Sequence, residues 1–148
     1  MPTFVDELTF KAKKSLGSYA DSVDISINGK NLIEMLKAYE LPYAIKEGHP
    51  DIAGQYMGIG SRELFERLSK PGQHKIIFIC NGCGEEGCWP MIMDIHENAH
   101  TATWSHFRQP HRGSTSKASY WDYSGFPTFT FDKIKYEAAM ASLKNNFS

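Results

Sequence analysis

The stretch 91–107, MIMDIHENAHTATWSHF, carries the strongest fold signal in the chain. Its two arms, 91–97 and 101–107, are rich in apolar, β-branched and aromatic residues, and Asn98-Ala99 between them suits a turn. The apolar run KIIFIC at 75–80 is typical of a strand covered on both faces. The connections are short, so these segments predict an antiparallel meander. TFTF at 128–131 is expected to add a last short strand.

Capping signals predict three helices around this sheet. Asn31 is expected to cap a helix over 32–39, with Glu34 three residues on as in a capping box, and Pro42 is expected to end it. Ser61 is expected to cap a second, short helix whose inward residues are Leu64, Phe65 and Leu68.

The third predicted helix closes the chain. Asp132 is its expected cap, and Phe131 and Tyr136 occupy the two positions of a hydrophobic staple. Its apolar stripe comprises Tyr136, Met140, Leu143 and Phe147.

The first half of the chain gives fewer signals. Val23, Ile25 and Ile27 alternate as on one face of a strand, whereas 4–20 is ambiguous between strand and helix. The segment 41–60 shows no clean period and is expected to be a long loop. The sequence therefore predicts one α+β domain over 1–148, with an antiparallel sheet of three or more strands, two to three packed helices and a closing C-terminal helix.

Composition bounds the class of protein. The net charge is −1. The charged residues, 22% of the chain, form no basic stripe of the kind that nucleic-acid binders carry. No apolar run approaches the roughly 18 residues of a membrane span, and the N-terminus lacks an apolar stretch of signal-peptide length. With an odd number of cysteines, these features predict a cytoplasmic protein with no nucleic-acid or membrane partner. They leave the oligomeric state open.

All three cysteines lie in CNGCGEEGCWP at 80–90. If strands 91–97 and 101–107 turn symmetrically at Asn98-Ala99, Met91 lies opposite His106, and His106 then lies near the cysteine loop. His96 would be roughly 16 Å from that loop. Zinc prefers four thiolate or imidazole ligands in a tetrahedron. One hypothesis is therefore a zinc site made of Cys80, Cys83, Cys88 and His106, with His111 as the alternative fourth ligand.

Two other interpretations of the cysteine loop stay open. Cys83 or Cys88 with His106 could form a reactive thiol, although Glu85 and Glu86 disfavour a thiolate. Alternatively, the loop is a glycine-rich strand connection in which Cys80 is a small buried apolar residue.

A second constellation comprises WSHFRQPHR at 104–112 and YWDYSGF at 120–126. Trp, Tyr and Arg dominate the residues that carry binding energy in protein interfaces. The predicted partner-binding residues are Trp104, Arg108, His111, Arg112, Trp121, Asp122 and Tyr123. The alternative is that the aromatic residues complete the core and that Asp122 pairs with Arg108 or Arg112.

Five segments occur in a specific order: INGKNLIEMLKAYELPYA, EGHPDIAGQYMG, CGEEGCWPM, WSHFRQPHR and WDYSGFPTFTFDKIKYEAAM. Together they resemble a family of small bacterial proteins of uncharacterised function that share CxCGxxGCWPL, WSxFxQPHR and WDYSxFGPFxFDxxQYE. The resemblance covers about 23–143 and implies a stand-alone bacterial cytosolic domain, but it supplies no activity. Asn81 stands where the family has a cysteine, and Pro127-Thr128-Phe129 replaces Gly-Pro-Phe.

These observations favour a small non-enzymatic protein that binds a protein partner. An immunity-type protein, which neutralises a toxin by surface complementarity, is a specific version. The alternatives are a zinc-stabilised domain and a thiol-dependent or small-molecule-binding enzyme.

Overall fold

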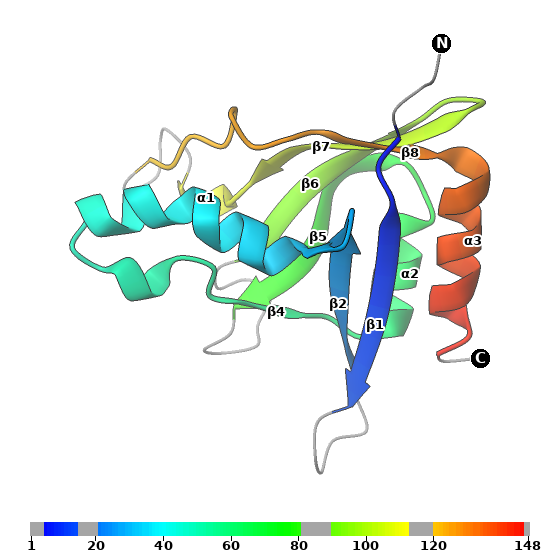
Figure 1. Ribbon diagram of the computed structural model, residues 1–148, viewed down its shortest axis with the longest axis horizontal. Helices are drawn as coiled ribbons and strands as arrows, with labels where there is room; N and C mark the ends of the chain where they lie inside the picture. The colour runs from blue at the N-terminus through cyan, green and yellow to red at the C-terminus, as the bar shows by residue number, and fades with distance from the viewer. Residues whose placement is uncertain (1–4, 15–20, 81–89, 113–119, 147–148) are drawn as a thin grey trace.

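The computed structural model describes residues 5–14, 21–80, 90–112 and 120–146. Over these residues the fold is α+β, as the sequence predicts, with two antiparallel sheets and three α-helices (Figure 1). In chain order the elements are β1 (Leu8–Lys14), β2 (Asp21–Ile27), β3 (Lys30–Asn31), α1 (Leu32–Lys46), the 3-10 turn η1 (Pro50–Ile52), β4 (Tyr56–Gly58), α2 (Ser61–Leu68), β5 (Gly72–Cys80), β6 (Met91–Glu97), β7 (Thr101–Arg108), the 3-10 turn η2 (Pro110–Arg112), β8 (Phe129–Asp132) and α3 (Lys133–Lys144).

The predicted meander is confirmed as β5-β6-β7-β8, and β4 adds a fifth strand beside β5. The expected long loop over 41–60 is wrong, because it contains the end of α1, η1 and β4. Gly58 lets β4 approach β2 closely, since a Cβ there would lie 2.3 Å from the Val23 carbonyl oxygen. This approach allows the Val23 N–H to donate to the Ile59 carbonyl at 2.9 Å. The ambiguous segment 4–20 contributes β1.

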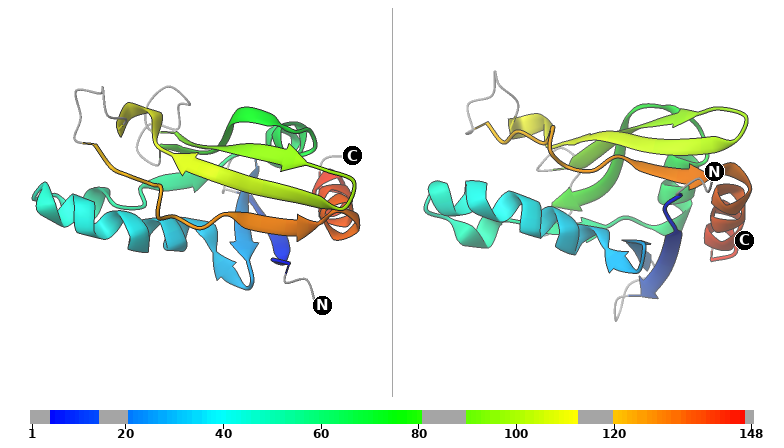
Figure 2. Two further views of the ribbon diagram at one scale, coloured as in Figure 1. Left: turned by 90° about the horizontal axis from the view of Figure 1, so that it is seen from above. Right: turned by 45° about the horizontal axis from the view of Figure 1, so that its top comes forward.

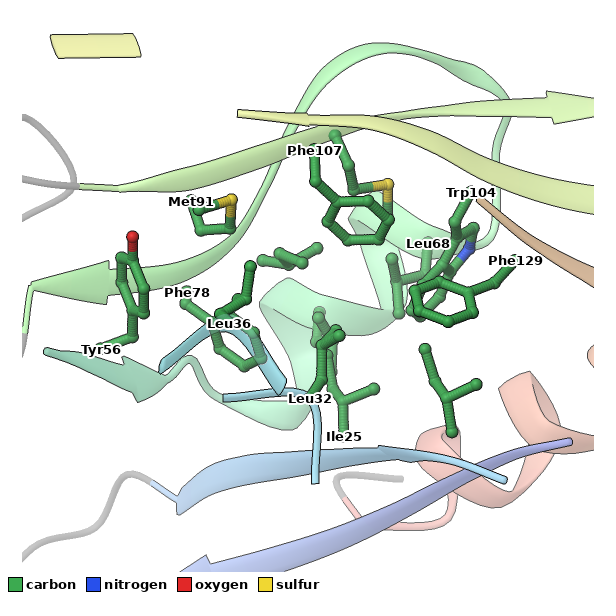
Figure 3. Close-up of a cluster of buried hydrophobic side chains, with 14 of the residues drawn as sticks. Ile25, Leu32, Leu36, Tyr56, Leu68, Phe78, Met91, Trp104, Phe107 and Phe129 are labelled. Atoms are coloured by element: carbon green, nitrogen blue, oxygen red, sulfur yellow. The ribbon is translucent and has the colours of Figure 1, made fainter. Parts of the chain in front are cut away.

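The core lies between the inner face of the five-stranded sheet and a layer formed by α1, α2 and the three-stranded sheet (Figure 3). Val23, Ile25 and Ile27 are buried on one face of β2, as their alternation predicts. Trp104 is fully buried, and its Nε1–H donates to the Tyr136 hydroxyl at 3.1 Å. The large buried side chains from both halves of the chain therefore form one continuous core.

Two helix caps are confirmed and one is wrong. Asn31 accepts from the Glu34 N–H at 3.1 Å, and Asp132 accepts from the Lys135 N–H at 3.1 Å. The staple rings, Phe131 and Tyr136, stack with centroids 5.7 Å apart. Ser61, by contrast, is the first helical residue of α2, because Gly60 takes the extended cap conformation.

Pro42 does not end α1, which continues to Lys46. A proline inside a helix costs about 3 kcal/mol through the lost hydrogen bond and ring clash. Beyond Pro42, the buried Ala44 and the Tyr43 hydroxyl bond to the Asp122 carbonyl tie the last turns to the rest of the molecule. Tertiary contacts thus outweigh the local cost, and the helix projects past the sheets (Figure 1).

The symmetric register assumed for β6 and β7 is wrong by two residues from Asp94 to Glu97 and by three residues beyond the bulge. Asp94 pairs with Ser105, and Ile92 pairs with Arg108 after a bulge that contains His106. Asn98 closes the hairpin by accepting from the His100 and Thr101 N–H groups, each at 2.8 Å. The turn is therefore one that the Asn98 side chain organises, longer than the two-residue turn expected.

Candidate functional site

A half-open pocket lies where the end of β5 meets η1, η2 and the segment that follows residue 119. Its volume is about 170 Å³. It is called the end pocket here and is lined by Ile52, Gln55, Tyr56, Cys80, Gln109, Arg112 and Trp121. These residues come from the two constellations singled out in the sequence and from the supposed loop. The fold therefore gathers segments far apart in the chain at one place.

One wall of the end pocket is a charged and aromatic stack. Arg112 Nη1 donates to both carboxylate oxygens of Glu47 at 3.0 Å, and the Trp121 Nε1–H donates to Glu47 Oε2 at 2.6 Å. The Arg112 Cζ lies 3.9 Å from the Trp121 ring centroid, a cation–π distance. Tyr43 stacks on Trp121 with centroids 6.0 Å apart. Glu47 thus holds both ring and guanidinium in fixed orientations.

Beneath this wall lies a buried carboxylate, Glu40, which is 1% exposed. It accepts from the Tyr56 and Tyr123 hydroxyls, each at 2.5 Å, and from the Gly54 N–H at 2.8 Å. Burial raises the pKa of Glu40, although these hydrogen bonds and the charge of Arg112 oppose the shift. Burial likewise raises the pKa of Tyr56, with the neighbouring Glu40 carboxylate adding to the effect. These three hydrogen bonds to one carboxylate hold three parts of the chain against α1: Gly54, which follows η1, strand β4 and the 120–126 segment.

A shallower depression lies on the other side of Trp121. Its volume is about 760 Å³, and its lining residues are Pro42, Tyr43, Lys46, Glu47, His49, Tyr120 and Trp121. Tyr120 is 55% exposed, unusual for a large aromatic side chain. The Tyr39 and Tyr43 hydroxyls donate to the Asp122 carbonyl at 2.6 and 3.1 Å, which holds this segment on α1. The end pocket and the depression share Trp121 and therefore form one surface.

The predicted partner-binding residues separate into four groups. Arg112 and Trp121 line the end pocket, and the exposed His111 lies beside it. Asp122 and Tyr123 support the pocket from below through the bonds just described. Trp104 belongs to the core, where it is 0% exposed and so offers no surface to a partner.

Arg108 lies on the opposite, outer face of the sheet, where its Nη1 contacts Asp94 at 3.1 Å. The predicted pairing of Asp122 with Arg108 or Arg112 is wrong, because Arg108 pairs with Asp94 and Arg112 pairs with Glu47. The alternative in which the aromatic residues complete the core is confirmed, because Trp104, Phe107, Trp121, Tyr123 and Phe126 are all buried in the core cluster. Trp121, which is 4% exposed, also lines the end pocket.

The structure separates Cys80 from His106. Cys80 lies two residues beyond Phe78, which pairs with Met91, whereas His106 lies level with Met93. The offset along the strands is four residues, or roughly 13 Å. Cys80 also faces the end pocket, while His106 lies on the outer face beside Asp94. The predicted proximity of His106 to Cys80, which favoured His106 as a zinc ligand, is therefore wrong.

The other proposed zinc ligands are partly outside the described residues. Cys83 and Cys88 lie in 81–89, which the structure does not describe, and His111 is exposed at η2. Within the described ranges, no three His, Cys, Asp or Glu side chains are placed to hold a metal ion. A zinc site built on the cysteine loop stays a prediction, which elemental analysis of protein purified without chelator tests. The reactive thiol is likewise untested.

The residues that sequence reasoning missed are Glu40, Glu47 and Tyr56. A signal for Glu40 existed, because the inward positions of α1 run 32, 36, 40 and 44 at helical spacing. Extending the helix past Pro42 would have put a carboxylate on its buried face. Tyr56 had no local signal, since β4 is a three-residue strand that long-range pairing with β5 defines.

Comparison with protein families, with characterised proteins and with solved structures finds no match to this chain. The family resemblance stated above therefore stays a prediction. Among the described helices, none has the length and apolar character needed to cross a membrane.

Proposed function

We propose that this protein is a small binding protein whose end pocket accepts one bulky apolar side chain of a protein partner. The observation that carries the proposal is the small volume of the pocket, together with the apolar and aromatic residues that line it. Sites for drug-sized ligands typically measure 300–1,000 Å³. At about 170 Å³, the end pocket is smaller than that range and suits a single anchoring side chain.

The chemistry of the surface around the pocket supports a protein partner. Its apolar wall is formed by Ile52, Cys80 and the Trp121 ring, and Gln55 and the buried Gln109 supply polar groups to the lining. Arg112 and Trp121 belong to residue types that are enriched at the interface positions contributing most of the binding energy. The exposed Tyr120 ring extends the contact area into the neighbouring depression. This arrangement combines a central anchoring pocket with an aromatic, polar surround.

Two further elements belong to the proposal. An immunity-type protein is a specific version of this function, with a toxin as the partner. A cytoplasmic location follows from the odd cysteine count and the ordinary charge balance.

Site-specific photo-crosslinking tests the proposal. A photoreactive residue replaces Tyr120 beside the pocket or, as a control, Ile134 on α3, which is 79% exposed. We expect a defined crosslinked product from position 120 and none from position 134. Ile52→Trp, which fills the pocket from its partly buried rim, should abolish that product while the protein keeps its unfolding midpoint. An identical product from both positions, or one that survives Ile52→Trp, would overturn the proposal.

A further inference from the structure

The outer face of the five-stranded sheet carries two histidines with unusual backbones. His74 has φ +59° and His106 has φ +55°, and both lie at irregularities in their strand pairings. Non-glycine residues in this left-handed region cost free energy and concentrate at functional sites. Bulges near active sites commonly redirect a side chain. Both histidines flank the same residue of the strand between them, Asp94.

The four side chains at this place form a continuous chain of contacts. His74 Nδ1 lies 3.1 Å from Arg108 Nη2, Arg108 Nη1 lies 3.1 Å from Asp94 Oδ1, and His106 Nδ1 lies 3.1 Å from Asp94 Oδ2. We call His74, Asp94, His106 and Arg108 the outer-face quartet. The His74 N–H also donates to Asp94 at 3.1 Å, and Arg108 donates to the His106 carbonyl at 2.7 Å. Each bulge is therefore tied to the shared carboxylate or guanidinium.

The hydrogen-bond partners of the two neutral imidazole rings give them complementary donor and acceptor roles. Asp94 only accepts, so the proton of His106 is on Nδ1 and its Nε2 is an acceptor. Arg108 only donates, so His74 Nδ1 accepts and the proton is on its Nε2. Arg108, which lies between them, carries a positive charge. The quartet thus offers a ligand two donors, the Arg108 guanidinium and the His74 Nε2–H, and one acceptor, the His106 Nε2.

A purely structural role does not require these exposed rings. The backbone N–H of His74 and the Arg108 side chain already fasten both bulges to Asp94. The His106 side chain is 66% exposed, so its pairing with Asp94 adds little stability. Figure 2 (left) looks down on this face, and no helix of the described chain covers β6 and β7 there. The imidazole edges therefore remain open to solvent.

We infer that the outer-face quartet is a binding site for a phosphate monoester. A tetrahedral phosphate monoester has enough oxygens to meet the Arg108 guanidinium and the His74 ring together, and in its monoanionic form its P–OH group can donate to His106. A planar carboxylate has two oxygens and no such proton to donate. The site is separate from the end pocket, and its existence does not depend on the proposed function.

Titrations of the whole protein with inorganic phosphate, sulfate and acetate at constant ionic strength test this inference. We expect phosphate to bind more tightly than sulfate or acetate and to shift the ring ¹⁵N resonances of His74 and His106 but not of His96. Arg108→Gln should weaken phosphate binding roughly tenfold or more, the equivalent of one charge-assisted hydrogen bond. His106→Asn should weaken it severalfold, because asparagine tolerates the left-handed backbone while lacking the ring.

Two controls keep the result interpretable. His96→Asn, an exposed histidine two residues along β6 from Asp94, and Arg62→Gln on α2 should leave phosphate binding unchanged. The ring resonances of the wild-type protein report binding directly if Arg108→Gln does not fold.

The source of the monoester is tested with an O-phosphoserine peptide and adenosine 5′-monophosphate. Tighter binding of the peptide supports a phosphorylated protein as ligand, and tighter binding of the nucleotide supports a small metabolite. Equal responses to phosphate, sulfate and acetate, or unchanged affinity in both Arg108→Gln and His106→Asn, would overturn the inference.

Discussion

Glu40 and Asp94 are carboxylates in two regions of the molecule, and their surroundings act on them in opposite directions. Glu40 lies beneath the end pocket, and burial raises its pKa although two hydroxyls and a backbone N–H bond to it. Asp94 lies on the outer face of the sheet. Its partial burial raises its pKa, but the hydrogen bond from the His74 N–H, together with His106 and Arg108, lowers the pKa overall.

The difference lies in the partners. Neutral hydroxyls compensate a buried charge only in part, whereas a guanidinium and a histidine stabilise the ionised form directly. Glu40 is therefore suited to holding three chain segments together. Asp94 is suited to orienting charged groups at an open surface.

The largest effect we expect comes from removing the Glu40 carboxylate. Glu40→Ala leaves the Tyr56 and Tyr123 hydroxyls and the Gly54 N–H without their acceptor in a buried place. Each such group costs about 1–3 kcal/mol, so we expect a loss of about 3–5 kcal/mol in the free energy of unfolding. Urea denaturation measures it.

Two variants refine the Glu40 experiment. Glu40→Gln keeps one acceptor oxygen and should lose roughly 1–2 kcal/mol. Glu34→Ala removes an exposed carboxylate from the same helix and should change stability by about 0.5 kcal/mol or less. A Glu40→Ala protein within about 1 kcal/mol of the wild type would show that water replaces the carboxylate.

Trp121→Phe should have the next largest effect, because it keeps an aromatic ring on Arg112 but removes the Nε1–H bond to Glu47. Hydrogen bonds to charged groups are worth about 1.5–3 kcal/mol, and partial exposure reduces this to about 1–2 kcal/mol here. The matched variant Tyr43→Phe removes a longer bond to the neutral Asp122 carbonyl and should cost about 0.5–1 kcal/mol. Equal losses for both would mean that the charge on Glu47 adds nothing.

The same two regions show how far the sequence determines the fold. Strands β5, β6 and β7 and the capped helix α3 were predictable, because alternation, turn residues and caps act within about ten residues of chain. The end of α1 was not, since Pro42 is a strong local stop signal that Glu40 and Ala44 override through contacts elsewhere. The bulge at His106 also had no local signal, and together with the displaced turn at Asn98 it shifted the strand register on which the zinc hypothesis depended.

The candidate site was predictable in part, for a related reason. Arg112 and Trp121 stand in segments whose composition alone suggests a binding surface. Glu47 and Tyr56 come from a segment without periodicity, and only tertiary pairing brings them to the pocket. The outer-face quartet was half found, because Arg108 and His106 drew attention whereas Asp94 looked like one polar residue of an apolar strand.

On the outer face, Asp94→Asn should have a smaller effect than either change at the pocket. The amide oxygen still accepts from the His74 N–H, so the loss comes from the ion pair with Arg108 and the exposed contact with His106, about 0.5–1 kcal/mol in total. Asp24→Asn removes a pair with Lys13, whose side chain is 57% exposed, and should cost close to nothing. A loss for Asp94→Asn as large as that for Glu40→Ala would remove the distinction between the two carboxylates.

The smallest expected effect is a pair of opposite pH dependences. The pKa of Glu40 is raised by folding, so its contribution to stability is complete below the unfolded value of about 4.3 and is lost as pH rises through the folded pKa. The pKa of Asp94 is lowered, so its contribution is present above about 3.9 and is lost as pH falls through the folded pKa. Urea denaturation from pH 3 to 8 measures both against the variants without these charges. The stability difference between wild type and Glu40→Gln should fall with rising pH, and that between wild type and Asp94→Asn should rise and then level off. If both differences changed in the same direction, hydrogen bonding rather than burial would dominate at Glu40, and folding would lower its pKa as it lowers that of Asp94.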